Sequence, residues 1–469
     1  MPRSVRLLPA LLALSTLMAP SGRAIEPWSE NPWYWSHNGE PVLLVGGSDD
    51  DNLFQWPDER LGRQLDRLVA AGGNVVRNTM SDRRDGRDWE VYAFARRDDG
   101  RYDLTRFNPE YWRRFERFLG ETARRGVFVQ IEVWDRFDFT DLRQPNWQSH
   151  PFNPKNNVNY GYEESGFAER YDKHPGRNEQ PFFFTTPEQR DNSLVLGFQQ
   201  RFVDRLLEAS LAYDHVLYCI DNETSGDPAW GRYWARYLRE QARGRGESVA
   251  VTEMWDSHDL RSDEHRQTFD HPDLYTFVDV SQNNHKSGQQ HWDNFLFVRG
   301  YLAARPRPMN TTKTYGADGN KFGHSDRDGV ERFWRHLLAG AASVRFHRPP
   351  SGLGLSDKAL ASIRAARLLE ERVPLWTVEP DNSLLADREP NEAYLAAAAG
   401  ERYALFATDG GQFALDLSPA PGAWKFEWID IDRGVLGPAE HVEGGRSVSL
   451  SPPGDGPWAA AVTQARADP

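Results

Sequence analysis

Eight short apolar runs alternate with amphipathic helical segments between residues 40 and 374, and this alternation restricts the possible folds more than any other feature of the sequence. The runs are rich in Val, Ile and Leu, as are parallel strands that are covered on both faces. In chain order they span 41–47, 74–80, 127–135, 215–223, 248–256, 274–285, 307–316 and 344–350. A strand followed by a helix, repeated eight times, predicts a closed (β/α)8 barrel.

An open, doubly wound sheet also alternates strands with helices. That fold usually has a Gly-rich phosphate-binding turn after its first strand, and none follows the run 41–47. The count of eight and the missing turn together favour the closed barrel.

The pattern changes after about Leu375. Short alternating runs such as "RYALFATDGG", "WKFEWIDIDRG" and "WAAAVTQ" are separated by Gly, Asp and Pro turns. This spacing is typical of a small antiparallel β-sandwich. We therefore predict a barrel domain over 25–374 and a sandwich domain over 375–469.

Residues 1–24 have the pattern of an export signal. Arg3 and Arg6 precede the apolar stretch "LLPALLALSTLMA", and small residues lead to a cleavage site after Ala24. The apolar stretch is shorter than a membrane-spanning helix, and no later run reaches spanning length. The sequence therefore predicts a secreted or periplasmic protein without a membrane span.

Composition narrows the choice of partners. The net charge of −13 argues against a nucleic-acid partner, because phosphates require a local excess of Lys and Arg. The 17 tryptophans fit either a heavily aromatic core or a surface that stacks on sugar rings. The single Cys219 excludes an intramolecular disulfide, and the histidines lack paired zinc-like spacing. We predict neither a metal nor a cofactor, and the sequence does not indicate an oligomeric state.

Polar residues gather where the eight predicted strands end. In strand order these residues are Ser48, Asp49, Asp50 and Asp51; Arg77, Asn78 and Asp82; Glu132, Trp134 and Asp135; Asn222 and Glu223; Glu253, Trp255, Asp256 and His258; Asn283, Asn284 and His285; Lys313, Tyr315 and Asp318; and Arg345, His347 and Arg348. In a (β/α)8 barrel the carboxyl ends of the strands form one rim, where active sites lie. Carboxylates, amides and aromatic rings on one rim are the groups that glycoside hydrolysis requires.

Two of these strand ends resemble a known family. "GGNVVRN" at the second strand and "IDNE" at the fourth are similar to the large clan of retaining glycoside hydrolases built on (β/α)8 barrels. The resemblance implies that Glu223 is the general acid/base, that Asn222 contacts the sugar 2-hydroxyl and that Arg77 is a supporting cation. Residues 390–465 also resemble the C-terminal sandwich of secreted bacterial barrel proteins, which is commonly labelled a collagen-binding domain.

The seventh strand departs from the pattern of that clan. The clan places its nucleophilic Glu at the end of this strand, whereas here "RPMNTTKTYG" puts Lys313 in that position. Three alternatives remain for the second carboxylate: it is Glu253, it is Glu132 or Asp135, or the barrel binds glycans without cleaving them. We favour Glu253, as general base of an inverting reaction, because its strand lies next to the fourth. Lys313 would then lower the pKa of a neighbouring carboxylate.

The remaining candidates are expected to bind the sugar. The predicted substrate-binding residues are Asp50, Arg77, Trp134, Asp135, Asn222, Trp255, His285, Lys313 and Tyr315. The long irregular segment 137–184 is expected to wall a substrate cleft, since structureless loops of this length are usually functional or disordered.

Each choice has a structural alternative. Glu223 could belong to a helix cap, although Asp227 already occupies the N-cap position before Pro228. Glu253 could pair structurally with Arg77 or Lys313, and the strand-end tryptophans could be core. The function predicted from the sequence is hydrolysis of O-glycosidic bonds in an extracellular or periplasmic poly- or oligosaccharide. The alternative is a non-catalytic glycan- or matrix-binding protein.

Overall fold

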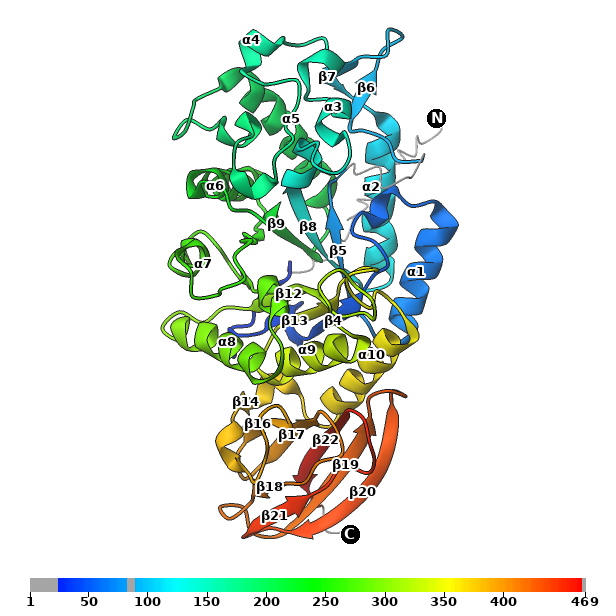
Figure 1. Cartoon of the computed structure of the whole chain (residues 1–469), viewed down its shortest axis with the longest axis vertical. Coiled ribbons are helices and arrows are strands. Elements are labelled where there is room, and N and C mark those ends of the chain that lie inside the picture. Colours follow the sequence, from blue (N-terminus) through cyan, green and yellow to red (C-terminus); the bar gives the residue numbers. More distant parts are fainter. Residues whose placement is uncertain (1–23, 82–88, 466–469) are drawn as a thin grey trace, which may run out of the picture.

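The computed structural model describes residues 24–81 and 89–465, which form a barrel of strands and helices followed by antiparallel sheets (Figure 1). The predicted signal peptide, except Ala24, lies outside the described residues, as does Asp82.

The barrel strands form one eight-stranded parallel sheet in the order β10-β9-β8-β5-β4-β13-β12-β11. Their bounds are β4 (Leu44–Gly47), β5 (Val75–Thr79), β8 (Phe128–Asp135), β9 (Val216–Asn222), β10 (Ala250–Thr252), β11 (Val278–Asp279), β12 (Met309–Thr314) and β13 (Ser343–Phe346). The two end strands of this order are joined by hydrogen bonds outside the regular ladder. The Thr276 N–H donates to the Val251 carbonyl at 2.8 Å. The Thr252 hydroxyl donates to the Phe277 carbonyl at 2.8 Å. The prediction of a (β/α)8 barrel is confirmed.

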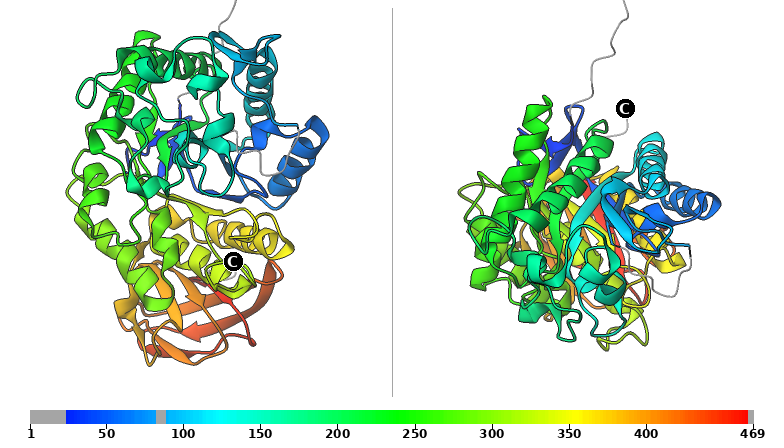
Figure 2. Two further views of the ribbon diagram at one scale, coloured as in Figure 1. Left: turned by 45° about the horizontal axis from the view of Figure 1, so that its top comes forward. Right: turned by 90° about the horizontal axis from the view of Figure 1, so that it is seen from above.

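One principal helix follows each barrel strand and covers the outside of the sheet (Figures 1 and 2). These helices are α1 (Asp58–Ala70), α2 (Pro109–Arg124), α5 (Ser193–Ser210), α6 (Pro228–Gly244), α7 (Asp263–Phe269), α8 (Gly288–Tyr301), α9 (Asp326–Leu338) and α10 (Asp357–Glu370). The Asp227 side chain accepts the Ala229 N–H and caps α6, as predicted. Among the helices of the described ranges, none is long and apolar enough to span a membrane.

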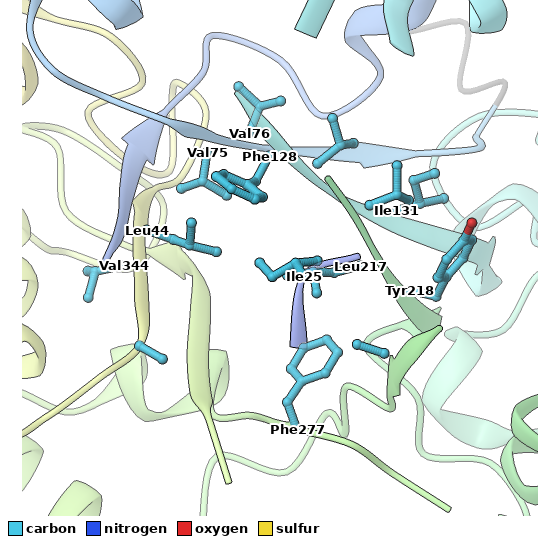
Figure 3. Packing of buried hydrophobic residues seen from close by; sticks show 14 of the residues in the cluster. Ile25, Leu44, Val75, Val76, Phe128, Ile131, Leu217, Tyr218, Phe277 and Val344 are labelled. Carbon is cyan, nitrogen blue, oxygen red and sulfur yellow. The ribbon is translucent and has the colours of Figure 1, made fainter. Parts of the chain in front are cut away.

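The amino-terminal end of the barrel is closed by the first described residues. They form a small antiparallel sheet of β1 (Glu26–Pro27), β2 (Trp35–His37) and β3 (Glu40–Val42). Ile25 lies among Leu44, Leu217 and Phe277 of the barrel interior (Figure 3). The described residues thus fill this end of the barrel interior with apolar side chains.

The segments after β5 and β8 carry additional structure. A hairpin of β6 (Phe94–Arg96) and β7 (Tyr102–Phe107) precedes α2 and was not predicted. The long segment after β8 is folded into the short helices α3 (Asn146–Ser149) and α4 (Tyr162–Ser165) and several 3-10 turns. Its aromatic rings pack on one another; Phe139 and Phe182, for example, stack with centroids 4.0 Å apart. The segment is therefore an ordered wall above the barrel.

The C-terminal part contains two antiparallel sheets, as predicted for a sandwich. One sheet has the order β14-β16-β17-β22-β19-β20 and the other the order β15-β18-β21. The bounds are β14 (Glu379–Pro380), β15 (Leu385–Ala386), β16 (Ala393–Ala398), β17 (Arg402–Ala407), β18 (Phe413–Asp416), β19 (Ala423–Asp430), β20 (Val435–Glu443), β21 (Ser447–Leu450) and β22 (Trp458–Gln464). The sequence did not indicate β20.

The larger sheet packs against α9 and α10 of the barrel (Figure 1). The Trp334 ring of α9 stacks on Phe406 of β17 with centroids 5.9 Å apart. At the edge of this contact, Arg327 forms an ion pair with Asp409 at 3.0 Å. Apolar residues of both parts belong to one continuous buried cluster, so the sandwich is fixed to the side of the barrel.

Candidate active site

A cavity of about 380 Å³ lies at the carboxyl ends of the barrel strands. Its lining comes from strand ends and from the loops that follow them: Asp51, Arg77, Phe137, Arg143, His174, Asn222, Glu223, Asp256, His258, His285, Lys313, Tyr315, Lys321, Phe322, His347, Arg348 and Ser351. Three of these residues, Phe137, Arg143 and His174, belong to the segment 137–184 that we expected to wall a cleft.

Glu223 follows the last residue of β9 and points into this cavity. Its backbone has a φ of +52°, in the left-handed region that residues other than glycine rarely adopt. One carboxylate oxygen lies 2.6 Å from the Lys313 ammonium and accepts the Tyr315 hydroxyl at 3.1 Å. Burial by itself would raise the pKa of Glu223, but the positive charges of Lys313 and Arg77 outweigh it and hold that pKa well below its usual range. Glu223 is therefore ionised at neutral pH.

Asn222 is held on both sides of its amide. Its oxygen accepts from Arg77 at 2.6 Å and also from Lys313. Its nitrogen donates to the Asp135 carboxylate at 2.9 Å. Since donors face the oxygen and an acceptor faces the nitrogen, the orientation of the amide is fixed.

Arg77 and Asp51 connect the second, first and eighth strand ends. The Arg77 guanidinium binds Glu132 at 2.6 Å and Asp51 at 2.9 Å. Asp51 also pairs with Arg348 at 2.7 Å. Burial opposes ionisation of Asp51, but Arg77 and the neighbouring basic groups keep its pKa well below the usual range. The Asp51 carboxylate thus holds three strand ends together through its ion pairs.

Asp256 is the third acid of the cavity. It follows β10, and its backbone N–H donates to the Thr224 carbonyl at 2.9 Å, which ties it to the residue after Glu223. Burial, and then the negative charge of Glu223, raise the pKa of Asp256 to about 7. Two carboxyl groups with pKa values shifted in opposite directions therefore line one cavity. The sequence placed Asp256 at a strand end, but we did not select it as a site residue.

Glu253, the predicted second carboxylate, does not reach the cavity. Its side chain lies between the barrel wall and α6, and the residue is only 1% exposed. One oxygen accepts the backbone N–H groups of Asp221 at 2.9 Å and Met254 at 3.0 Å. A Cβ placed on Gly231 of α6 would lie 2.6 Å from the other oxygen. Burial, and then the nearby Asp221 carboxylate, raise the pKa of Glu253 well above its ordinary value. This position is incompatible with contact to a substrate in the cavity.

Glu132 and Asp135, the other candidates for the second acid, also lie outside the lining. Glu132 is fully buried against Arg77, and burial raises its pKa to about 7 despite that cation. Asp135 is engaged with Asn222, as described above. Each of them contacts a cavity residue, Glu132 through Arg77 and Asp135 through Asn222.

Both predicted tryptophan platforms are part of the core. Trp134 is 4% exposed and packs against Phe202 and Trp234, with ring centroids 5.3 Å and 5.4 Å away. Trp255 is 2% exposed, and its indole N–H donates to the Thr268 hydroxyl at 2.7 Å. Asp50 is buried as well and accepts the Trp56 indole N–H at 2.6 Å. None of the three lines the cavity.

The structure brings six of the predicted site residues together at the cavity: Arg77, Asn222, Glu223, His285, Lys313 and Tyr315. Tyr315, His285 and Phe322 form one aromatic cluster in the cavity lining, with ring centroids 4.9 to 5.0 Å apart. Phe322 was not predicted, because it lies in a loop of no recognisable pattern. Within the described ranges, no group of three or more His, Cys, Asp and Glu side chains is placed to hold a metal ion.

Comparison with known proteins shows similarity in fold. No family model and no curated protein matches the sequence. A family 5 glycoside hydrolase from Bacteroides vulgatus superposes with a TM-score of 0.62 at 13% identity, covering 94% of this chain and 93% of its own. A second structure, described as a glycoside hydrolase, has a TM-score of 0.62 at 12% identity over 95% of this chain and 98% of its own. A maltogenic α-amylase from Thermotoga neapolitana has a TM-score of 0.51 at 10% identity, covering 90% and 99%. The chain thus has the barrel-and-sandwich fold of glycoside hydrolases.

Proposed function

We propose that this protein is an exported glycoside hydrolase that cleaves O-glycosidic bonds in a poly- or oligosaccharide. The observation that carries the proposal is the pair Glu223 and Asp256, two carboxyl groups on neighbouring strand ends that line one cavity and have pKa values shifted in opposite directions. Glycosidic cleavage needs one proton donor and one ionised carboxylate. Environments that push the pKa values of two acids apart assign these roles.

Asp256 is the proton donor in this mechanism. With a pKa of about 7 it keeps its proton at mildly acidic pH and can transfer it to the leaving oxygen. Glu223 is ionised and either attacks the anomeric carbon or activates water. This assignment changes the role that the resemblance implied for Glu223, because the Lys313 ammonium stabilises the form without a proton.

Three neighbours support these two groups. Asn222, held by Arg77 and Asp135, presents a fixed amide for a sugar hydroxyl. The Tyr315 hydroxyl and the Lys313 ammonium orient the Glu223 carboxylate. The site uses only protein side chains in this scheme.

The test begins with a panel of polysaccharides assayed for release of reducing ends. On any glycan that is cleaved, Glu223→Gln and Asp256→Asn should each lower kcat/KM by about 10³-fold. For the wild type, kcat/KM should fall as pH rises above about 7, because Asp256 then loses its proton. Retention of activity by Glu223→Gln would remove this carboxylate from the mechanism.

A second candidate function is glycan binding without cleavage. It is favoured by Lys313, whose ammonium occupies the seventh strand end and engages the Glu223 carboxylate directly. In that case the wild type would bind a glycan of the panel and release no reducing ends from it under any condition.

A further inference from the structure

The cavity carries more basic than acidic side chains. Its Lys, Arg, Asp and Glu lining consists of Arg77, Arg143, Lys313, Lys321 and Arg348 against Asp51, Glu223 and Asp256. The whole chain has the opposite balance, with 56 Lys and Arg against 69 Asp and Glu. Positive charge is thus concentrated at the cavity of an acidic protein.

Three of the five basic groups have acidic partners in the lining. Arg77 and Arg348 pair with Asp51 at 2.9 Å and 2.7 Å, and Lys313 pairs with Glu223 at 2.6 Å. The third acid, Asp256, has a pKa raised to about 7, so it is mostly protonated at acidic pH. At acidic pH the lining therefore offers no further carboxylate for the other two basic groups.

Arg143 and Lys321 are the two remaining cations, and neither has an ion pair within residues 24–81 and 89–465. Arg143 belongs to the segment after β8 and Lys321 to the loop between β12 and α9, and both are exposed at the rim. Desolvation of its ammonium, and then the positive charge of Arg143, lower the pKa of Lys321, and the Glu223 carboxylate offsets part of this repulsion. An anion bound beside them would remove this repulsion.

An apolar surface adjoins this pair of cations. The Lys321 ammonium lies 4.6 Å from the centroid of the Phe322 ring. Phe322 in turn packs against Tyr315, whose hydroxyl donates to Glu223. A sugar ring that lies against Phe322 would have its substituents near Lys321, with Tyr315 between Phe322 and the Glu223 carboxylate.

We propose that the cavity selects acidic saccharides, in which Arg143 and Lys321 bind a carboxylate or a sulfate ester on a sugar lying against Phe322. This inference rests on the proposed function for the presence of a saccharide and names the class that it belongs to. The shared chemistry is a fixed negative charge on a sugar ring, and the uronic and sulfated sources are separated by experiment.

The test compares glycans that differ only in charge. Dissociation constants are measured for oligosaccharides of polygalacturonate and of glucuronoxylan, each against its carboxyl-reduced form, and of a sulfated galactan against its desulfated form. We expect one charged member to bind about tenfold more tightly than its neutral counterpart. Because the rim is exposed, the difference should shrink in 0.5 M NaCl. The pair that shows it identifies the carboxylate or the sulfate. Equal binding within every pair would overturn the proposal.

Variants then assign the effect to the rim. The double variant Arg143→Gln/Lys321→Gln should lose the tenfold preference and keep its affinity for the neutral member. The matched control is Arg63→Gln/Arg433→Gln, which removes two positive charges whose side chains are 69% and 79% exposed on α1 and the sandwich. An equal loss in both doubles would overturn the assignment.

Binding is measured apart from turnover, so the two proposals fail separately. A charged glycan that binds preferentially but is never cleaved supports the acidic class and counts against the hydrolase. A neutral glycan that is cleaved and bound as tightly as its charged counterpart supports the hydrolase and overturns the acidic class.

Discussion

Glu223 and Glu253 end neighbouring strands of the same barrel, yet they occupy opposite environments. Glu223 faces the cavity, contacts Lys313 at 2.6 Å and has a side chain 18% exposed. Glu253 faces α6, accepts the backbone N–H groups of Asp221 and Met254, and is 1% exposed. The same side chain thus has a lowered pKa on one side of the barrel wall and a raised pKa on the other.

The difference shows that a residue at the end of a barrel strand can face either the cavity or the surrounding helices. Successive residues of a strand point to opposite faces. Asn222 contacts Arg77 inside the barrel, so its neighbour Asp221 turns outward, towards Arg136 and Glu253. Glu223 does not follow this alternation, because it comes after the last residue of β9 and has a φ of +52°, and it lines the cavity as Asn222 does.

The largest change in activity should come from removing the Lys313 ammonium, which contacts Glu223 and does not contact Glu253. In Lys313→Met, burial is no longer opposed by the ammonium, so the pKa of Glu223 rises. The pKa of Asp256, which Lys313 also lowers, rises as well. We expect kcat/KM at pH 6 to fall about 100-fold. Both limbs of the profile of kcat/KM against pH should move upward.

Lys425→Met is the matched control for this variant. Lys425 lies in the sandwich and has an ion pair of similar length, 3.0 Å, with Glu427. Its removal should leave the pH profile unchanged. A lower kcat/KM in Lys313→Met with both limbs in place would mean that the ammonium does not set the charge of Glu223.

Much of the fold could be predicted from the sequence, because the spacing of apolar residues indicates which residues of a strand or helix are buried. The eight β-branched runs correspond to strands that are buried on both faces. β20 escaped prediction for the opposite reason. It is an edge strand of the larger sheet, nearly all of its side chains are exposed, and it contains Gly437 and Pro438. An edge strand of this kind has no buried face to impose an alternating pattern.

The candidate site was predictable only where a residue belongs to a strand end with a fixed facing. Glu223, Asn222 and Lys313 meet at the cavity as their positions at strand ends suggested. Trp134 and Trp255 have equally suggestive positions, but they are buried among side chains that the sequence could not place beside them. Phe322 and Lys321 lie in a loop, where neither hydrophobic periodicity nor secondary-structure propensity indicates which way a side chain points. Their role depends on contacts between segments far apart in the chain.

A smaller effect is expected at the group that orients Asn222. Asp135 accepts the Asn222 amide at 2.9 Å through one oxygen and the Phe137 N–H at 3.0 Å through the other. In Asp135→Asn only one oxygen remains for these two donors, so one bond is lost. We expect kcat to fall about tenfold with the unfolding midpoint within about 2 °C of the wild type. A wild-type kcat in this variant would show that the amide keeps its place without Asp135.

The smallest effect on activity is expected at Glu253, which faces α6 on the outside of the barrel sheet. In Glu253→Gln the neutral amide keeps the oxygen that accepts from Asp221 and Met254, so kcat/KM should stay within about threefold of the wild type. A loss of 100-fold or more would return Glu253 to the mechanism.

The stability of the same variant should depend on pH. The raised pKa of Glu253 means that the folded wild type keeps a proton that the unfolded chain releases once pH exceeds its ordinary value. The free energy of unfolding therefore falls as pH rises through the interval between the two pKa values, and Glu253→Gln removes that loss. The unfolding midpoint of Glu253→Gln should match the wild type at pH 4 and exceed it by about 2 °C at pH 8.

Glu110→Gln is the opposite control. Hydrogen bonds from Arg113 and Arg114 lower the pKa of Glu110 to about 2. The ionised form of Glu110 therefore stabilises the fold above the ordinary pKa of a glutamate. That variant should show no gain at pH 8. A higher unfolding midpoint for Glu253→Gln at both pH values would instead mean better packing. The contrast between Glu223 and Glu253 would then not be electrostatic.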